Sequence, residues 1–159
     1  MAPSTSTAIP SFYRIFFPSI DPLIALSGAF FAYFQPDVTM SSMFPLSHAW
    51  ARITPAHTML LQQLGGWYIS VIFLQVFLLR YTQDVNIWKL FQFSVLITDA
   101  ALFQSLWVAL KAQERLQIEK VRPEEWGTAA ITGFVAVVRI LFLAGVGFGK
   151  KGGGIKKRN

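Results

Sequence analysis

The sequence predicts an all-α integral membrane protein that folds as one four-helix bundle, and three observations lead to this class. Of its 159 residues, 53% are hydrophobic and 14% are charged, whereas about a quarter of the residues of a soluble domain are charged. Four apolar runs, at about 12–34, 57–79, 88–110 and 126–147, are each long enough to cross a hydrocarbon layer about 30 Å thick. Together these runs account for most of the chain, which favours a bundle of spans over a soluble core with a tail.

The composition excludes several kinds of site. The chain has no cysteine, so disulfides, cysteine-ligated zinc and a cysteine nucleophile are excluded. His48 and His57 are the only histidines, and they lack the i, i+4 spacing with which two helical residues hold a metal ion. We therefore predict no metal site and no cofactor. We also expect no nucleic-acid partner, because most of the chain is predicted to lie in the lipid bilayer.

The first span contains an aspartate between two prolines. Pro18 and Pro22 each lack a backbone N–H, which predicts a loosened turn around Asp21. The alternative is that Asp21 is the N-cap of a helix that begins at Pro22. Such a helix would have only about 13 residues before Gln35-Pro36, too few to cross the bilayer. We therefore expect Asp21 to be an intramembrane residue.

The connection between the first two spans, residues 35–56, is long for a compact bundle and contains three prolines. Segments of this kind are either lids or interfacial segments. Phe44 and Trp50 would anchor an interfacial segment. Both interpretations stay open.

The second span has an unusual polar content. Gln63 and Trp67 share one helix face, and Gln62 and Gly66 share the neighbouring face. Gly65 and Gly66 permit a close approach of two helix backbones or a bend. The glutamines either tie helices together, as amides usually do in lipid, or contact a ligand.

The third span, at 88–110, places Asp99 in its middle, near the centre of the bilayer, and its only other charged residue is Lys89 at its start. A carboxylate there requires a partner or a proton inside the bundle. Gln92 lies seven residues earlier on the same face, and Leu96 and Phe103 complete the stripe. Gln92 is expected to support Asp99 if the intervening turns leave a cavity.

The third connection is the one strongly charged segment. Residues 111–128 carry both signs, and we expect this connection to extend the third helix beyond the membrane with its charges, including Glu125, solvated. Pro123, followed by Glu124 and Glu125, predicts the start of the fourth helix.

The fourth span carries an arginine on a polar stripe. Thr128, Thr132 and Arg139 recur at intervals of four and seven residues on an otherwise apolar helix. Arg139 lies about ten residues before Gly149, which is about 15 Å along a helix and too far for its side chain to reach the surface easily.

The distribution of basic residues predicts the orientation. Four spans put both termini and the second connection on one side, which carries more Lys and Arg than the other, so the termini are predicted to be cytosolic. We expect residues 1–11 to be a disordered lead, 12–149 the four-span domain and 150–159 a basic tail. The final KKRN resembles the dilysine signal of endoplasmic reticulum membrane proteins; contact with anionic lipid is the alternative.

Three charges are predicted to meet inside the bundle. Counted from the cytosolic helix ends, Asp21, Asp99 and Arg139 lie about 13, 16 and 15 Å deep at a rise of about 1.5 Å per residue. Arg139 would keep one carboxylate ionised while the other holds a proton, which is an arrangement suited to acid/base catalysis. A purely structural Asp–Arg–Asp clamp would have the same parts. Because intramembrane ionisable residues are by default functional, we favour catalysis or ligand binding.

Several segments also resemble a known family. FYRIFFPSIDPLIALSGAFFAYFQPD, TMLLQQLGGWY, LLRYTQDVNIWK, TDA and VVRILFLAGVG are similar to segments of the small fungal integral membrane proteins of natural-product gene clusters. That family includes the membrane-bound epoxide hydrolases of aurovertin- and citreoviridin-type polyketide pathways. The resemblance covers most of residues 11–148.

The resemblance implies a hydrolase or cyclase of secondary metabolism that opens epoxides of an apolar polyene polyketide. A flavin monooxygenase would install these epoxides, and ring opening would give cyclic ethers or diols. The catalytic residues would be Asp99 and Asp21, one as acid and one as base, with Arg139 setting their protonation states. The substrate-binding residues would be Gln62, Gln63, Trp67, Tyr68, Gln92 and Phe103.

Two other functions compete with this interpretation. A sterol isomerase of the EXPERA type also places acids in a small helical bundle, where a Trp near a carboxylate stabilises a carbocation. A non-catalytic lipid-binding or scaffold protein would use the clamp for structure alone. The oligomeric state, including a possible homodimer, stays open.

Overall fold

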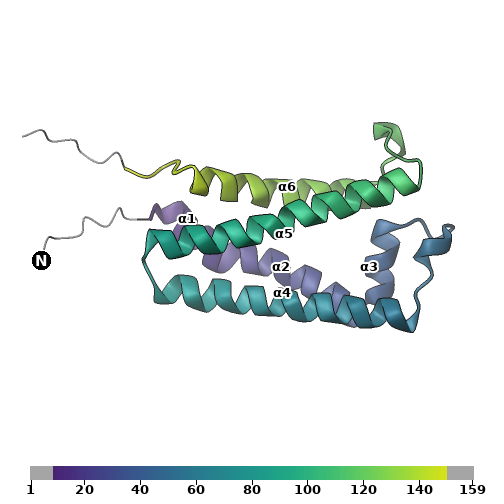
Figure 1. Ribbon diagram of the computed structural model, residues 1–159, viewed down its shortest axis with the longest axis horizontal. Coiled ribbons are helices and arrows are strands. Elements are labelled where there is room, and N and C mark those ends of the chain that lie inside the picture. The colour runs from purple at the N-terminus through teal and green to yellow at the C-terminus, as the bar shows by residue number, and fades with distance from the viewer. Residues whose placement is uncertain (1–8, 150–159) are drawn as a thin grey trace, which may run out of the picture.

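The structure is a computed structural model that describes residues 9–149, and this part of the chain contains helices and turns but no strand. Figure 1 shows long helices lying side by side, with α1 and the last turns of α6 at one end of the bundle and α3 at the other. We call these the α1 end and the α3 end. In chain order the elements are α1 (Ser11–Ile15), the π-helix η1 (Phe16–Ile20), α2 (Asp21–Phe34), α3 (Pro36–Met43), the 3₁₀ helix η2 (Ala49–Ala51), α4 (Pro55–Tyr81), α5 (Val85–Ala112), the 3₁₀ helix η3 (Ile118–Lys120) and α6 (Pro123–Leu143).

Four helical segments are long and apolar enough to cross a membrane: Ser11–Phe34, Pro55–Tyr81, Val85–Ala112 and Pro123–Leu143. The shortest has 21 residues, or about 32 Å at a rise of about 1.5 Å per residue. Large apolar side chains cover their outer faces; Leu23 is 68% exposed and Leu90 is 73% exposed. The predicted all-α bundle of four spans is confirmed, and the chain is a multi-pass membrane protein.

The first span is irregular where its prolines lie. The π-helix η1 contains Pro18 and precedes α2, and α2 begins at Asp21 without a side-chain cap hydrogen bond. Pro22 has no N–H to offer the carbonyl oxygen of Pro18, and this oxygen accepts a hydrogen bond from Nη2 of Arg80 at 3.1 Å. The predicted loosened turn is confirmed, and the alternative that Asp21 is a helix cap is wrong.

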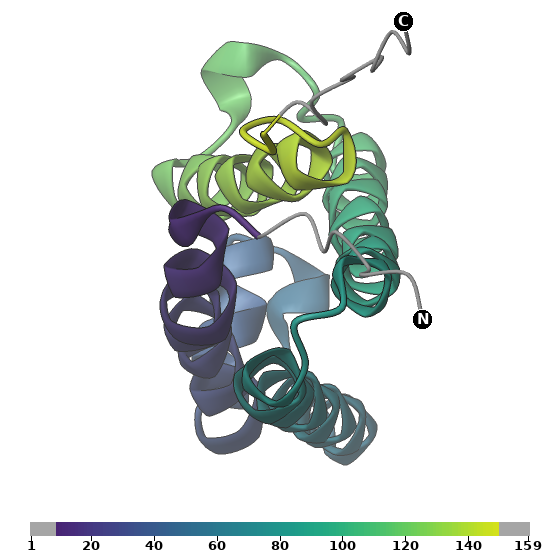
Figure 2. The same cartoon turned by 90° about the vertical axis from the view of Figure 1, so that its left-hand side faces the viewer.

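The helices form two pairs, α2 with α4 and α5 with α6, and the end-on view in Figure 2 shows the members of each pair next to each other. At the first crossing, a Cβ atom on Gly65 would lie 3.1 Å from Cβ of Tyr33 and 3.3 Å from the carbonyl oxygen of Ala29. The close approach predicted at the glycine pair is therefore confirmed at Gly65. A Cβ on Gly66 would meet nothing within 4 Å.

An aromatic core joins the two pairs at the α1 end. Phe17 and Phe142 are fully buried there with Trp88, and the hydroxyl of Tyr13 donates to the carbonyl oxygen of Val146 at 3.1 Å. Ile9 belongs to this core at 5% exposure. Its apolar side chain packs instead of remaining free, so the predicted disordered lead over residues 1–11 is wrong for residues 9–11. The KKRN tail lies outside the described residues.

An ion-pair cluster closes the α3 end. Glu125 is 1% exposed, and its carboxylate accepts hydrogen bonds from Arg115 at 2.8 Å and from Arg122 at 3.1 Å. Arg122 also donates to the carbonyl oxygens of Ser41 and Ser42, both at 3.0 Å. These bonds hold α3 against the start of α6, so the first connection is a structured cover and not a simple loop.

The third connection differs from its prediction. The helix α5 ends at Ala112 instead of continuing beyond the membrane, and Glu114, at a φ of 55°, reverses the chain. Glu125 is buried instead of solvated, because two arginines neutralise it. The predicted start of the fourth helix at Pro123 is confirmed.

Candidate functional site

The three predicted intramembrane charges meet around one guanidinium group. Arg139 of α6 donates from Nη2 to Oδ2 of Asp21 at 2.7 Å and from Nη1 to Oδ2 of Asp99. Arg139 and Asp21 are each 3% exposed and Asp99 is 7% exposed. The predicted convergence of these charges is therefore confirmed. We call this group, with the two glutamines described next, the Asp–Arg–Asp cluster.

Two glutamines complete the cluster. Gln75 of α4 donates from Nε2 to Oδ2 of Asp21, the same oxygen that Arg139 contacts. Gln92 of α5 accepts a hydrogen bond from Nε of Arg139 at 3.2 Å. Gln92 thus supports Asp99 through the arginine, not by direct contact. The sequence prediction missed Gln75, although a lone amide inside the apolar run 71–79 was a signal for it.

Several polar atoms of the cluster have no partner among the described residues. The second carboxylate oxygen, Oδ1, of Asp21 and of Asp99 accepts no hydrogen bond. Nε2 of Gln92 is buried and also lacks an acceptor. Exchanging the oxygen and nitrogen of this amide would direct its NH₂ group at the N–H of Arg139, so the observed orientation is the favourable one. The cluster can therefore accept hydrogen bonds at two carboxylate oxygens and donate them from the NH₂ group of Gln92.

The charge of the cluster favours one bound proton. Two carboxylates and one guanidinium carry a net charge of −1, which is unfavourable in a bundle surrounded by lipid. One proton on either carboxyl group makes the cluster neutral. The cluster then contains a carboxylic acid and a carboxylate held on adjacent nitrogens of the same guanidinium, which is the pair that acid/base catalysis requires.

The predicted substrate-binding residues of α4 lie on different faces of that helix. Tyr68 is half-buried and close to Gly28 of α2. Gln62, Gln63 and Trp67 are exposed, and Trp67 is 55% exposed. The structure does not bring these three residues into the cluster. The reason is the packing of Gly65 on α2, which turns the face of Tyr68 and Gln75 inward and the other faces outward.

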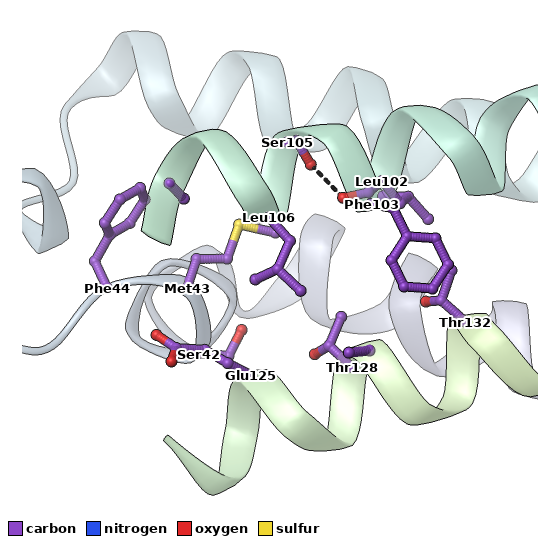
Figure 3. Close-up of a pocket in the computed structure, with 12 residues that line it drawn as sticks. Ser42, Met43, Phe44, Leu102, Phe103, Ser105, Leu106, Glu125, Thr128 and Thr132 are labelled. Atoms are coloured by element: carbon purple, nitrogen blue, oxygen red, sulfur yellow. Dashed lines mark hydrogen bonds between the residues drawn. The ribbon is translucent and has the colours of Figure 1, made fainter. Parts of the chain in front are cut away.

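Phe103 lies outside the cluster and lines a separate pocket. This pocket has a volume of about 170 Å³ and lies between the end of α3, the second half of α5 and the first half of α6. Figure 3 shows the ring of Phe103 directed from α5 towards Thr132 of α6. Thr128 and Thr132 line the pocket from the polar stripe of α6.

The two histidines take part in local hydrogen bonds. Nδ1 of His48 accepts from the backbone N–H of Trp50, and Nδ1 of His57 accepts from that of Thr54 at the start of α4. Over residues 9–149, no group of three or more His, Cys, Asp or Glu side chains is placed to hold a metal ion.

Comparison with known proteins identifies a family. No curated protein matches the chain, and no solved structure matches it. The model of one family matches residues 6–150, which is most of the chain and includes all four spans and the whole Asp–Arg–Asp cluster. The chain therefore belongs to the family described as domain of unknown function DUF7704.

Proposed function

We propose that this protein is a membrane-embedded epoxide hydrolase or cyclase that opens epoxides of an apolar polyene polyketide by acid/base catalysis. One observation carries the proposal: Arg139 holds one oxygen of Asp21 and one oxygen of Asp99, while the second oxygen of each carboxyl group has no hydrogen-bond partner within residues 9–149. An acid and a base are thus adjacent, and in our proposal the oxygen of each that is not held by Arg139 meets the reactant.

The reaction uses both available oxygens. The protonated carboxyl group donates its proton to the epoxide oxygen as the carbon–oxygen bond breaks, and the carboxylate takes a proton from the attacking water or internal hydroxyl as the new bond forms. Water gives a diol, and an internal hydroxyl gives a cyclic ether. The acid loses one proton and the base gains one, so a proton transfer between these neighbouring groups restores the starting state.

The hydrogen bonds support an assignment of the two roles. Oδ2 of Asp21 accepts from both Gln75 and Arg139, whereas Oδ2 of Asp99 accepts from Arg139 alone. Donated hydrogen bonds stabilise a carboxylate over its protonated form. We therefore assign Asp21 as the base and Asp99 as the acid.

The unpaired amide nitrogen of Gln92 favours a reactive site over a purely structural clamp. A buried donor without an acceptor costs about 1–3 kcal/mol, and a cluster built only for stability would have no reason to keep one. Nε2 of Gln92 has no acceptor among the described residues. In our proposal it donates to an oxygen of the attacking water or of the substrate.

The sterol-isomerase alternative has less support. It requires a Trp side chain beside a carboxylate. Trp67 is 55% exposed, and the indole N–H of Trp88 donates to the carbonyl oxygen of Thr82 near the α1 end. We therefore keep epoxide opening as the proposed reaction.

The cellular setting is part of the proposal. An apolar polyene would reach the cluster from the bilayer, after a flavin monooxygenase has formed its epoxides. We propose the endoplasmic reticulum membrane with cytosolic termini, on the basis of the charge bias and of the resemblance of KKRN to a dilysine signal.

The test uses an epoxidised polyene and the purified protein in detergent. Wild type should give a diol or a cyclic ether, and Asp99→Asn should lower kcat by about 10²–10⁴-fold because it removes the acid. Mass spectrometry in H₂¹⁸O distinguishes water attack, which adds the label, from internal attack, which does not. Asp37→Asn, which changes an exposed carboxylate of α3, is the matched control and should keep full activity.

Three results would contradict the proposal. Epoxide-opening activity that survives in a folded Asp99→Asn protein would exclude Asp99 as the catalytic acid. A sterol double-bond shift by wild type, without epoxide opening, would favour an isomerase. A folded wild type that converts neither substrate would favour a scaffold.

A further inference from the structure

The pocket at the α3 end is apolar and has no free charge. Met43 and Phe44 line it from the end of α3, and Leu102, Phe103 and Leu106 line it from α5. Figure 3 shows the side chains of Met43 and Leu106 meeting across it. The pocket therefore favours a hydrocarbon group over a polar one.

The polar groups around the pocket are already bound within the protein. The hydroxyl of Ser105 donates to the carbonyl oxygen of Leu102, and that of Thr128 donates to that of Glu124. Glu125, which closes the far end, is paired with Arg115 and Arg122. A ligand would find no unpaired charge there.

The pocket and the Asp–Arg–Asp cluster are both lined by residues of α5 and α6. Phe103 follows Asp99 by four residues on α5, and Thr132 precedes Arg139 by seven residues on α6. These spacings correspond to about one and two helical turns, or about 6 and 10 Å along the helix axes, and they keep each pair on one helix face. The pocket and the cluster therefore lie within about 6 to 10 Å of each other along the same faces of α5 and α6.

We propose that this pocket binds the apolar end of the substrate and selects its length, an inference that rests on the proposed epoxide opening. A cavity of about 150 Å³ lined by apolar side chains accepts benzene, and this pocket has about 170 Å³. It therefore accommodates a hydrocarbon end of about six carbons. The adjoining epoxide then lies beside Asp99, and a longer end meets the closed Glu125 cluster.

The first experiment compares two epoxides that differ in chain length. Thr132→Phe fills the pocket, and it should lower kcat/KM for an epoxide bearing a hexyl group at least about tenfold more than for one bearing an ethyl group. Ile131→Phe is the matched control, because Ile131 is 53% exposed on the outer face of the same helix. Leu106→Ala enlarges the pocket and should shift the preference towards longer chains.

A binding measurement separates this inference from the proposed reaction. An octane chain with a diazirine at one end should, on irradiation, label Met43 or Leu106 in wild type and in Ile131→Phe. Labelling of these residues should fall at least about tenfold in Thr132→Phe. This readout needs no turnover, so labelling at the pocket without epoxide opening supports the binding site and contradicts only the reaction.

Other results would overturn the inference. Epoxide opening with labelling elsewhere would leave the reaction intact and exclude the pocket. The same conclusion follows if Thr132→Phe and Ile131→Phe change the hexyl-to-ethyl ratio equally. If Thr132→Phe does not fold, an unchanged chain-length preference in Leu106→Ala would contradict the pocket by itself.

Discussion

The arginine at the centre of the cluster is suited to its place because its donors lie in one plane. Arg139 uses Nη1 for Asp99, Nη2 for Asp21 and Nε for Gln92. A lysine ammonium is a compact charge on a flexible stem and cannot hold three partners in a fixed arrangement. Charge and shape therefore both matter at position 139.

We expect Arg139→Gln to lower the free energy of unfolding by about 3–5 kcal/mol, since it leaves two buried carboxylates without their cation. Arg139→Lys should recover part of this stability but not the epoxide-opening activity, because the carboxyl groups lose their shared support. Unfolding of the detergent-solubilised protein by SDS measures the first effect, and turnover measures the second.

Arg14→Gln is the matched control for that experiment. It removes the same charge at an exposed position of α1. There the free energy of unfolding should change by no more than about 0.5 kcal/mol. Equal stability of Arg139→Gln and wild type would mean that the cluster is not desolvated as the structure indicates.

At the level of the helices, the described elements begin at residues that the sequence marks clearly. Pro55 and Pro123 occupy the first turns of α4 and α6, and Thr54 and Asp84 accept hydrogen bonds at the starts of α4 and α5. These local signals explain why the spans were predicted to within a few residues. The helix α3 was missed, because a short polar helix behind Pro36 has the composition of a loop.

The two adjacent glycines of α4 provide a matched test of helix packing. Gly65→Ala should lower the free energy of unfolding by about 1–3 kcal/mol, because its new methyl group meets the backbone oxygen of Ala29. The methyl group of Gly66→Ala meets nothing within 4 Å. This variant should leave the free energy of unfolding unchanged or raise it by up to about 1 kcal/mol, because alanine has the higher helix propensity.

Unfolding of both glycine variants in the same detergent checks this expectation. A loss of stability in Gly66→Ala equal to that in Gly65→Ala would mean that both glycines serve a local bend and not the contact between α2 and α4.

On the scale of the whole molecule, three contacts at different depths join the two helix pairs. The aromatic core around Phe17 and Phe142 joins them at the α1 end, and Arg139 connects α2 with α5 and α6 at the centre. Arg122 connects α3 with the start of α6 at the other end. Apolar packing and paired charges thus alternate along the bundle.

The orientation of the whole molecule can be tested with single cysteines, because the natural chain has none. Gln83→Cys lies in the short turn before α5, and Glu119→Cys lies in η3 at the opposite end; both positions are exposed. In sealed microsomes, a membrane-impermeant maleimide should label Gln83→Cys from the cytosolic side and reach Glu119→Cys only after permeabilisation. The reverse pattern would place the termini in the lumen.

The sequence alone determined the class of the protein, its four spans and the common depth of Asp21, Asp99 and Arg139. Depth follows from the constant rise of a helix, so it can be counted along the chain without knowledge of any neighbour. This is why the central ion pairs were predicted correctly from residues far apart in sequence.

Only the tertiary structure decided which side of each helix faces inward. Rotation of a helix about its axis depends on the partner against which it packs, and the contact of Gly65 with α2 turned Gln75 towards Asp21 and left Gln62, Gln63 and Trp67 exposed. The burial of Glu125 and the pocket beside Phe103 likewise arise where α3, α5 and α6 meet. Such contacts between distant segments have no periodic signal within any one of them.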